Sequence, residues 1–294
     1  PVFEASTDAS ITTIVNSKEN LETRYFPVKT LTNLNLFELT SGIYQKVVKD
    51  ATEWKFIDHS QESILDKLYR NSINLKEFSN DKIYRGITTG LNEAFVLNED
   101  IAAKLLKSES KKIVKPYAQS TDIKKWGLLD DNRYFLATGY DIDIKKDYPT
   151  AFKYLSQFET TLKNRQDKGR NWWNLRACKY YGDFAKPKII YMHTAKKHEF
   201  FLDTEGCYIN NSCYMIVSDS RYLFAFLNSN LFEWFKKIKF VAYGDAAESG
   251  RAKLDYNKMI TVPIKNANKK EQNVFDKLVN QILTLKGKGK DTTA

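Results

Sequence analysis

A short stretch around Gly169 carries cations of the kinds that contact nucleic acids. In the sequence KNRQDKGRNWWNLR, the candidate contacts are Arg165, Lys168, Arg170 and Arg176. A planar guanidinium can donate two parallel hydrogen bonds to guanine or to a phosphate, whereas lysine supplies a compact charge. We therefore expect at least one of these guanidinium groups to contact DNA, and the alternative is a solvated basic loop.

Two adjacent tryptophans, Trp172 and Trp173, lie among these cations. Neighbouring residues on a strand face opposite ways, so this order predicts one ring in the core and one exposed. We take Trp172 as the candidate to stack on a base or wedge between bases. Packing of both rings within the protein is the alternative.

A second candidate loop lies in the sequence RGITTGLNEAF. Its two glycines, Gly86 and Gly90, allow close approach of the backbone to a partner. The donors and acceptors of this loop are Arg85, Thr88, Thr89 and Asn92. They suit contacts with phosphates or base edges, while the alternative is a structural turn with Arg85 in an internal salt bridge.

Four further lysines complete the candidate DNA contacts. Lys115 and Lys124 occur in VKPYAQSTDIKKW, where they can position a DNA backbone. Lys186 and Lys188 flank Pro187 at the expected start of a strand. These last two either contact phosphates or protect a sheet edge from pairing.

The charge of the chain is concentrated around these candidates. The net charge is +10, and residues 160–200 contain ten Lys or Arg against three Asp or Glu, which is +7 of that excess. Aromatic residues alternate with the charges, which is typical of a nucleic-acid-binding surface. Charge alone leaves a merely solvated surface as the alternative.

Length and composition bound the class of protein. With 294 residues and 42% hydrophobic content, the chain can form one large domain or two smaller ones. It has no apolar run long enough for a membrane span and no signal-peptide pattern, so we expect a soluble, cytoplasmic protein. Cys178, Cys207 and Cys213 match no zinc-ligand spacing. The chain begins at Pro1, and we expect it to be part of a longer protein.

Hydrophobic periodicity predicts a mixed α+β chain. Expected strands cover residues 5–15, 21–31, 113–117, 133–143, 186–192 and 205–218, with a strand, tight loop and strand over 82–97. Expected helices cover residues 64–69, 98–108, 148–165, 220–237 and 269–286. A cap at Asn98 and apolar side chains every three or four residues from Phe152 to Leu162 are the strongest local signals.

The order of these blocks resembles a known family. The blocks are YRGITTGLNEAFVLNEDIAAKLL, IVKPYAQSTDIKKWG, YFLATGYD, YPTAFKYLSQFETTLKNRQDKGRNWWNL, FAKPKIIY and LNSNLFEWFKK. Over about residues 82 to 265 they resemble the TaqI-like specificity domain, found at the C-terminal side of adenine-specific DNA methyltransferases and fused (type IIG-like) restriction-modification enzymes. The opening FEASTDASITTIVNSKE is similar to strands that close the methyltransferase domain in such proteins.

The resemblance implies a domain layout and partners. It implies a mixed, mainly antiparallel sheet with packed helices at 81–265, preceded by the end of an α/β methyltransferase domain at 1–50 and a linker with a helix at 51–80. A C-terminal helix occupies 266–294. The implied partners are double-stranded DNA, a methyltransferase domain and, through the C-terminal helix, a second copy. Packing of that helix on its own domain is the alternative to dimerisation.

Catalytic motifs are missing from the sequence. Methylation of adenine in this class needs an NPP[YF] element and a glycine-rich turn for S-adenosylmethionine, and the chain contains neither. We therefore expect no catalytic residue, metal or cofactor here, with S-adenosylmethionine bound by the parent enzyme. A protein-docking module and an unrecognised nuclease are the alternatives to a DNA-recognition module.

Overall fold

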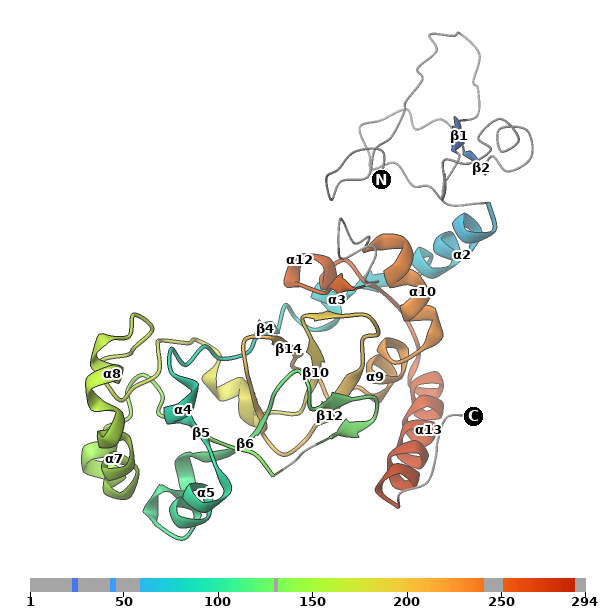
Figure 1. The fold of residues 1–294 in the computed structure, drawn as a ribbon. Helices are drawn as coiled ribbons and strands as arrows, with labels where there is room; N and C mark the ends of the chain where they lie inside the picture. Colours follow the sequence, from blue (N-terminus) through green and yellow to red (C-terminus); the bar gives the residue numbers. More distant parts are fainter. Residues whose placement is uncertain (1–22, 26–42, 46–58, 130–131, 241–250, 289–294) are drawn as a thin grey trace, which may run out of the picture. The chain divides into compact units, whose positions relative to one another are not determined.

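The computed structural model describes residues 23–25, 43–45, 59–129, 132–240 and 251–288 (Figure 1). The chain forms two compact units. The predicted strand at 5–15 lies outside the described residues, and within 21–31 only β1 (Thr23–Tyr25) is described, paired antiparallel with β2 (Ile43–Gln45). Within the described ranges, no helix is both long and apolar enough to cross a membrane.

The first unit contains a helix packed on a two-stranded sheet. Helix α2 (His59–Tyr69) contacts β16 (Pro263–Lys265), which pairs with β3 (Ser72–Asn74). Leu65 and Leu68 are the buried positions of α2. The Lys265 ammonium donates to the carbonyl of Arg70, which places a cation at the C-terminal end of the helix, where the helix dipole favours it.

The second unit is built on two four-stranded sheets. The first has the order β12-β10-β14-β4 with every pair antiparallel. Its strands are β12 (Phe200–Asp203), β10 (Lys188–Met192), β14 (Cys213–Ile216) and β4 (Ile83–Arg85). The side chains of β14 are all buried, and so are four of the five in β10, so the two central strands are covered on both faces.

The second sheet has the order β13-β6-β9-β5, in which only β13 and β6 are parallel. Its strands are β13 (Tyr208–Ile209), β6 (Val114–Ala118), β9 (Tyr134–Leu136) and β5 (Val96–Leu97). A parallel bridge joins Ile87, which comes soon after β4 of the first sheet, to Asn210, which comes directly after β13 of the second sheet. The prediction of an α+β fold with mainly antiparallel sheets is confirmed.

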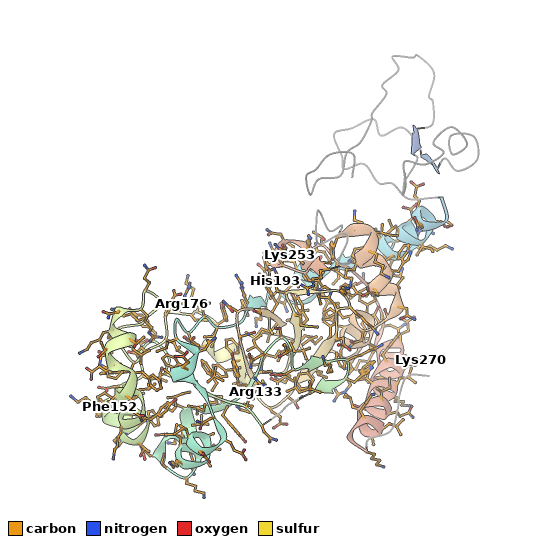
Figure 2. The ribbon with its side chains drawn as sticks, viewed as in Figure 1. Arg133, Phe152, Arg176, His193, Lys253 and Lys270 are labelled. Carbon is orange, nitrogen blue, oxygen red and sulfur yellow. The ribbon has the colours of Figure 1, made fainter. Side chains whose placement is uncertain are left out.

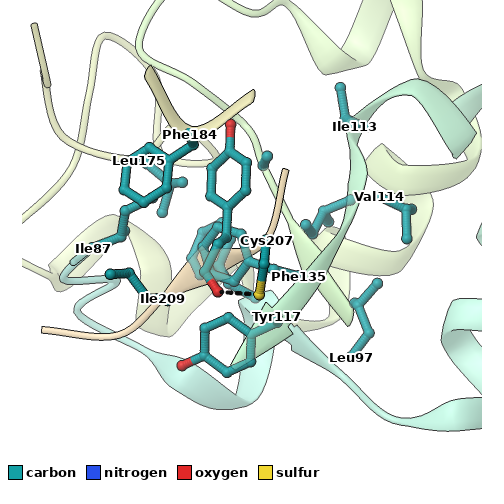
Figure 3. Packing of buried hydrophobic residues seen from close by; sticks show 14 of the residues in the cluster. Ile87, Leu97, Ile113, Val114, Tyr117, Phe135, Leu175, Phe184, Cys207 and Ile209 are labelled. Carbon is teal, nitrogen blue, oxygen red and sulfur yellow. Dashed lines mark hydrogen bonds between the residues drawn. The ribbon is translucent and has the colours of Figure 1, made fainter. Parts of the chain in front are cut away.

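Stacked aromatic rings fill the core of the second unit (Figure 3). The Phe135 ring centroid lies 5.4 Å from that of Tyr117 and 5.5 Å from that of Tyr208, and Tyr208 in turn stacks on Phe184 at 4.6 Å. These rings come from β6, β9, β13 and the segment before β10. Aromatic pairs of this kind stabilise a fold beyond the contribution of their buried area. The core therefore holds the two sheets and the segment around residue 184 against one another.

Helices and short strands surround these sheets (Figure 1). The helices are α3 (Leu75–Phe78), α4 (Asn92–Phe95), α5 (Glu99–Leu106), α6 (Ile144–Asp147), α7 (Pro149–Leu155), α8 (Glu159–Asn164), α9 (Arg221–Leu227), α10 (Asn230–Lys239), α12 (Tyr256–Met259) and α13 (Lys269–Gly287). The 3-10 segments are η1 (Glu109–Ile113), η2 (Ser156–Phe158) and η3 (Tyr181–Ala185). The remaining strands are β7 (Ile123–Lys124), β8 (Gly127–Leu128), β11 (Thr194–Ala195) and β15 (Ala252–Lys253).

Several local predictions are confirmed, and others differ. Asn98 caps α5 by accepting a hydrogen bond from the Ile101 amide, and residues 148–165 are helical through α7, η2 and α8. The expected helix at 220–237 is interrupted, because the Asn228 side chain bonds the backbone of Phe200 and Ser229 caps a new helix. Of the strand expected at 133–143, only β9 forms.

The segment 82–97 is not a hairpin. Strands β4 and β5 belong to different sheets, and α4 lies between them. The two strands therefore connect the sheets instead of pairing with each other. The sequence pattern identified the turn residues correctly but not the partner of each strand.

The C-terminal helix α13 packs against α9 of the same unit. It begins with a capping box in which Asn268 and Glu271 bond each other's backbone amides. Phe275 packs edge-on against Tyr222 at 5.0 Å, and Val279 is buried. This is the predicted alternative of packing on its own domain, and the predicted dimer remains a prediction.

Candidate nucleic-acid interface

The two predicted DNA-binding loops meet at the side chain of Arg165. Its guanidinium donates hydrogen bonds to the carbonyls of Thr89, Trp172 and Asn174, and its carbon Cζ lies 4.8 Å from the Phe95 ring centroid. Only 8% of Arg165 is exposed. Burial lowers the pKa of Arg165 to about 10, which still leaves the group charged at neutral pH. A predicted DNA contact is therefore an internal cation that joins the 85–92 loop to the 165–176 segment.

The glycines of the first loop serve this internal packing. A Cβ at Gly86 would lie 2.0 Å from the carbonyl oxygen of Asn210, which no side chain permits. Gly90 has φ +71°, and its missing side chain would lie 3.2 Å from the Arg165 side chain. The close approach that these glycines allow is to the protein's own chain, not to an external partner as predicted.

The Thr89 hydroxyl also makes its hydrogen bonds within the loop. It is buried, its hydroxyl donates to the Asn92 side chain at 2.6 Å, and it accepts from the Leu91 amide. These bonds fix the chain at the start of α4. The predicted contact of Thr89 with DNA is thus replaced by a local role, while Thr88 is half-buried and Asn92 is exposed.

A buried asparagine fixes a third loop beside the 165–176 segment. The Asn174 amide donates to the carbonyls of Gly139 and Ile142, both at 2.8 Å, and its oxygen accepts from the Asn171 amide at 3.0 Å. The Thr138 hydroxyl adds a bond to the Trp173 carbonyl. These bonds hold residues 138–142 against residues 171–174, so the loops lie in a fixed arrangement.

The other cations of the 165–176 segment are exposed. Lys168 donates to the carbonyl of Lys163 at 2.6 Å, near the end of α8. The Arg170 guanidinium lies 3.4 Å from the Asp141 carboxylate. Arg176 donates to the Asp167 carboxylate at 3.3 Å. All three side chains remain accessible to a partner, as the DNA-binding prediction requires.

Neither tryptophan is freely exposed. Trp172 and Trp173 are both half-buried, meet edge to face at 5.3 Å and pack on Phe152. The Trp173 indole also donates to the Ile142 carbonyl. The expected alternation of inside and outside does not occur, because the segment is a loop and not a strand. Trp172 remains a candidate for stacking as a half-buried residue.

The two lysines beside Pro187 have different environments. Lys188 is fully buried, where its ammonium pairs with Asp203 and donates to the Phe184 carbonyl. It is therefore not available to a phosphate, and this prediction is wrong for the folded chain. Lys186 is exposed and pairs with Asp183 at 2.7 Å.

A row of basic side chains, three of them exposed and two half-buried, extends from the 165–176 segment across the first sheet. We call it the basic row, and its members are Arg176, Arg85, His193, Lys253 and Lys258. Figure 2 shows Arg176, His193 and Lys253 on the same side of the ribbon. Arg85, at the end of β4, and Lys253, in β15, have exposed side chains and no ion pair among the described residues.

Short contacts and electrostatic effects connect the members of the basic row. The Tyr180 hydroxyl donates to the Arg85 carbonyl at 3.0 Å. Burial raises the pKa of Tyr180 to about 12, and the nearby charge of Arg176 opposes that rise. Burial lowers the pKa of His193, and the charges of Arg85 and Lys253 lower it further. His193 is therefore mainly neutral at neutral pH and contributes a hydrogen-bonding group among cations.

Sequence reasoning missed three members of this row. His193, Lys253 and Lys258 come from a turn after β10 and from a segment near the C-terminus, where no motif marked them. β11 and β15 pair in the register Thr194 to Lys253, and this pairing carries the lysine next to His193. A pairing between strands so far apart in sequence has no local signal.

The remaining predicted lysines lie elsewhere. Lys115 is half-buried near the start of β6, and Lys124 is exposed on β7. Neither takes part in the contacts that connect the basic row. Within the described ranges, no group of three or more His, Cys, Asp or Glu residues could hold a metal ion.

Comparisons with curated proteins identify type II methyltransferases as relatives. The chain is 28% identical over 165 residues to the type II methyltransferase M.MjaIV of Methanocaldococcus jannaschii, covering 51% of this chain and 55% of the relative. It is 26% identical over 163 residues to the type II methyltransferase M.BanIII of Aneurinibacillus aneurinilyticus, covering 50% of this chain and 28% of the relative. The chain thus spans about half of the first relative and less than a third of the second.

Solved structures with a similar arrangement are restriction enzymes. The type IIL restriction-modification enzyme MmeI in complex with DNA gives a TM-score of 0.49 at 12% identity, over 72% of this chain and 28% of that one. The type IIG restriction endonuclease BpuSI gives a TM-score of 0.47 at 11% identity, over 76% of this chain and 28% of that one.

A family model covers more than half of the chain. The family described as the TaqI-like C-terminal specificity domain matches residues 115–264. This range includes both central strands of the first sheet, the 165–176 segment and four of the five members of the basic row. The chain belongs to the family of TaqI-like C-terminal specificity domains.

Proposed function

We propose that this chain is the DNA target-recognition module of a restriction-modification methyltransferase. It binds a duplex through the basic row and the exposed residues of the 165–176 segment, and it presents one site to a catalytic domain of the parent enzyme. The basic row carries this proposal, since five basic residues from four separate segments are gathered on one side of a fixed scaffold. Residues 81–265 are the DNA-binding part, and residues 1–50 belong with the catalytic domain.

The chemistry of the row suits the phosphate backbone. Lysine and arginine side chains that neutralise phosphates release condensed counterions, and this gives affinity that falls steeply with salt. Arg85 and Lys253 are suited to this role because they are exposed cations without a carboxylate partner among the described residues. Lys168, Lys186 and Asn92 are further candidate contacts because they too are exposed.

Methylation itself belongs to the parent enzyme in this proposal. We propose adenine N6 as the modified atom and S-adenosylmethionine as the methyl donor, in keeping with the resemblance of the chain to adenine-specific methyltransferases. An enzyme of this kind must turn the target base out of the duplex, and a recognition module supplies the register for that step. The expected partners are double-stranded DNA and the methyltransferase domain.

Selection from randomised duplex DNA tests the proposal. The purified 294-residue chain is incubated with the pool, bound duplexes are sequenced, and the affinity of the enriched duplex is measured against salt. We expect enrichment of a short motif and a log affinity that falls by about 0.9 per neutralised phosphate for each tenfold rise in salt. Absence of binding at low salt would refute the proposal and favour a protein-docking module.

A further inference from the structure

The ion pair between Arg176 and Asp167 lies where the two loops meet. Asp167 packs beside Gly90 of the first loop, since a Cβ at Gly90 would be 3.6 Å from the Asp167 Cβ. Arg176 donates to the Asp167 carboxylate at 3.3 Å. The pair is accessible, with 57% of the Arg176 side chain and 40% of the Asp167 side chain exposed. It therefore combines a fixed place in the scaffold with access to a partner.

Both members keep unused hydrogen-bonding groups. Only one guanidinium nitrogen, Nη1, bonds to Asp167, and the other two nitrogens have no partner among the described residues. One carboxylate oxygen of Asp167 is likewise without a hydrogen bond there. The pair thus presents free donors of Arg176 next to a free acceptor of Asp167, and the hydrogen bond between the two residues fixes their relative position.

The carboxylate distinguishes this arginine from the rest of the basic row. A phosphate attracts the guanidinium but repels Asp167, so a backbone contact by Arg176 would bring two anions together. The edge of a G·C pair in the major groove has no such conflict. Guanine offers two acceptors, O6 and N7, and the paired cytosine offers the N4 amino donor.

We propose that Arg176 and Asp167 together read one G·C base pair, with the guanidinium on guanine and the carboxylate on the cytosine amino group. This inference rests on the proposed DNA-recognition function and names the pair of side chains that supplies one position of its specificity. Asp167 was not among the candidate residues from sequence. Its role follows from its place between Arg176 and Gly90.

The test uses the duplex that the unchanged chain selects, with each base pair varied in turn. We expect Arg176→Ala to relax preference at a single G·C position, reducing discrimination there by about 5- to 160-fold. Asp167→Ala relaxes the same position, although the variant gains one unit of positive charge. Arg170→Ala is the matched control, because its guanidinium also faces an aspartate, Asp141, and it should leave that position unchanged.

Replacing the guanine by 7-deazaguanine isolates the contact with one atom. This base lacks the N7 acceptor but keeps O6, so we expect weaker binding by the unchanged chain and a smaller loss on Arg176→Ala than with guanine. Equal loss of affinity for every sequence in Arg176→Ala, or tighter binding to every sequence in Asp167→Ala without lost discrimination, would overturn the inference. Failure of the unchanged chain to enrich any motif would instead refute the proposed function itself.

Discussion

Buried and exposed cations of the second unit differ in their surroundings. Arg165 and Lys188 donate to carbonyl or carboxylate oxygens in the interior, whereas Lys253 and Arg85, whose Nε donates to the Asn211 carbonyl, have exposed side chains. The four side chains belong to the same two residue types. The contrast shows that positive charge in this family member has two separate uses, one in the scaffold and one at the surface. Substitutions should separate them.

The largest effect is expected at Lys188. Lys188→Met leaves the buried Asp203 carboxylate without its cation, and loss of one partner from a buried pair costs about 3–5 kcal/mol in the free energy of unfolding. Urea denaturation measures this cost. Lys186→Met is the matched control, because its pair with Asp183 is exposed, and it should cost less than about 1 kcal/mol. Equal costs for the two variants would remove the distinction between buried and exposed lysines.

Arg165→Met should have the next largest effect. Three carbonyl groups, those of Thr89, Trp172 and Asn174, lose their donor, which we expect to cost about 3 kcal/mol in the free energy of unfolding. Amide hydrogen exchange should show faster opening of both loops. Arg170→Met serves as the control on the same segment. A stable Arg165→Met chain with unchanged exchange would mean that Arg165 does not join the loops.

The stability of the chain at acidic pH tests whether the buried His198 imidazole stays neutral in the folded state. His198 is buried beside the ammonium group of Lys236, at 3.2 Å, and burial and that charge lower the pKa of His198 to about 3. Below about pH 6.5 the unfolded chain takes up a proton that the folded chain does not, so stability falls as the pH falls. We expect this group to account for about 1 kcal/mol of lost stability between about pH 6 and pH 5.

Denaturation at these two pH values, with the unchanged chain and His198→Gln, measures the contribution. The glutamine variant can still accept from Lys236 but does not titrate, so its stability should change less over this range. An identical pH dependence in both chains would show that His198 is not the responsible group.

The smallest effect on stability is expected at the surface. Lys253→Ala should change the free energy of unfolding by less than about 0.5 kcal/mol, because Lys253 is exposed. It should weaken DNA binding equally for all sequences and make the dependence of log affinity on log salt shallower by about 0.9. Lys270→Ala, on α13 away from the row in Figure 2, is the control with the same loss of charge. Equal weakening by both variants would argue against a defined row.

Local signals in the sequence were sufficient for several elements. Capping at Asn98 and the apolar spacing from Phe152 to Leu162 act within one helix, so no distant contact is needed to read them. The break between α9 and α10 could not be read in this way, because it depends on the bonds of Asn228 to Phe200 in a separate strand. Periodicity continues through the break and hides it.

The candidate site was predicted only in part for a similar reason. The stretch from residue 165 to 176 was identified from its composition, but composition does not distinguish Arg165, which points inward, from Arg176, which points outward. His193 and Lys253 join the surface through the pairing of β11 and β15. Strand pairing and core packing thus decide which cations lie together. A count of charges along the sequence contains no information about either.

The hydrogen bonds of the buried Asn174 side chain have a consequence for how this surface can change over evolutionary time. The side chain bonds two carbonyls and one amide of the main chain, at Gly139, Ile142 and Asn171. Every amino acid has the carbonyl, and every one except proline has the amide N–H. These hydrogen bonds therefore do not depend on which side chains the two loops carry. Residues such as Asp141 and Arg170 can be exchanged without loosening the loops, so new side-chain combinations can be sampled while the scaffold is inherited intact.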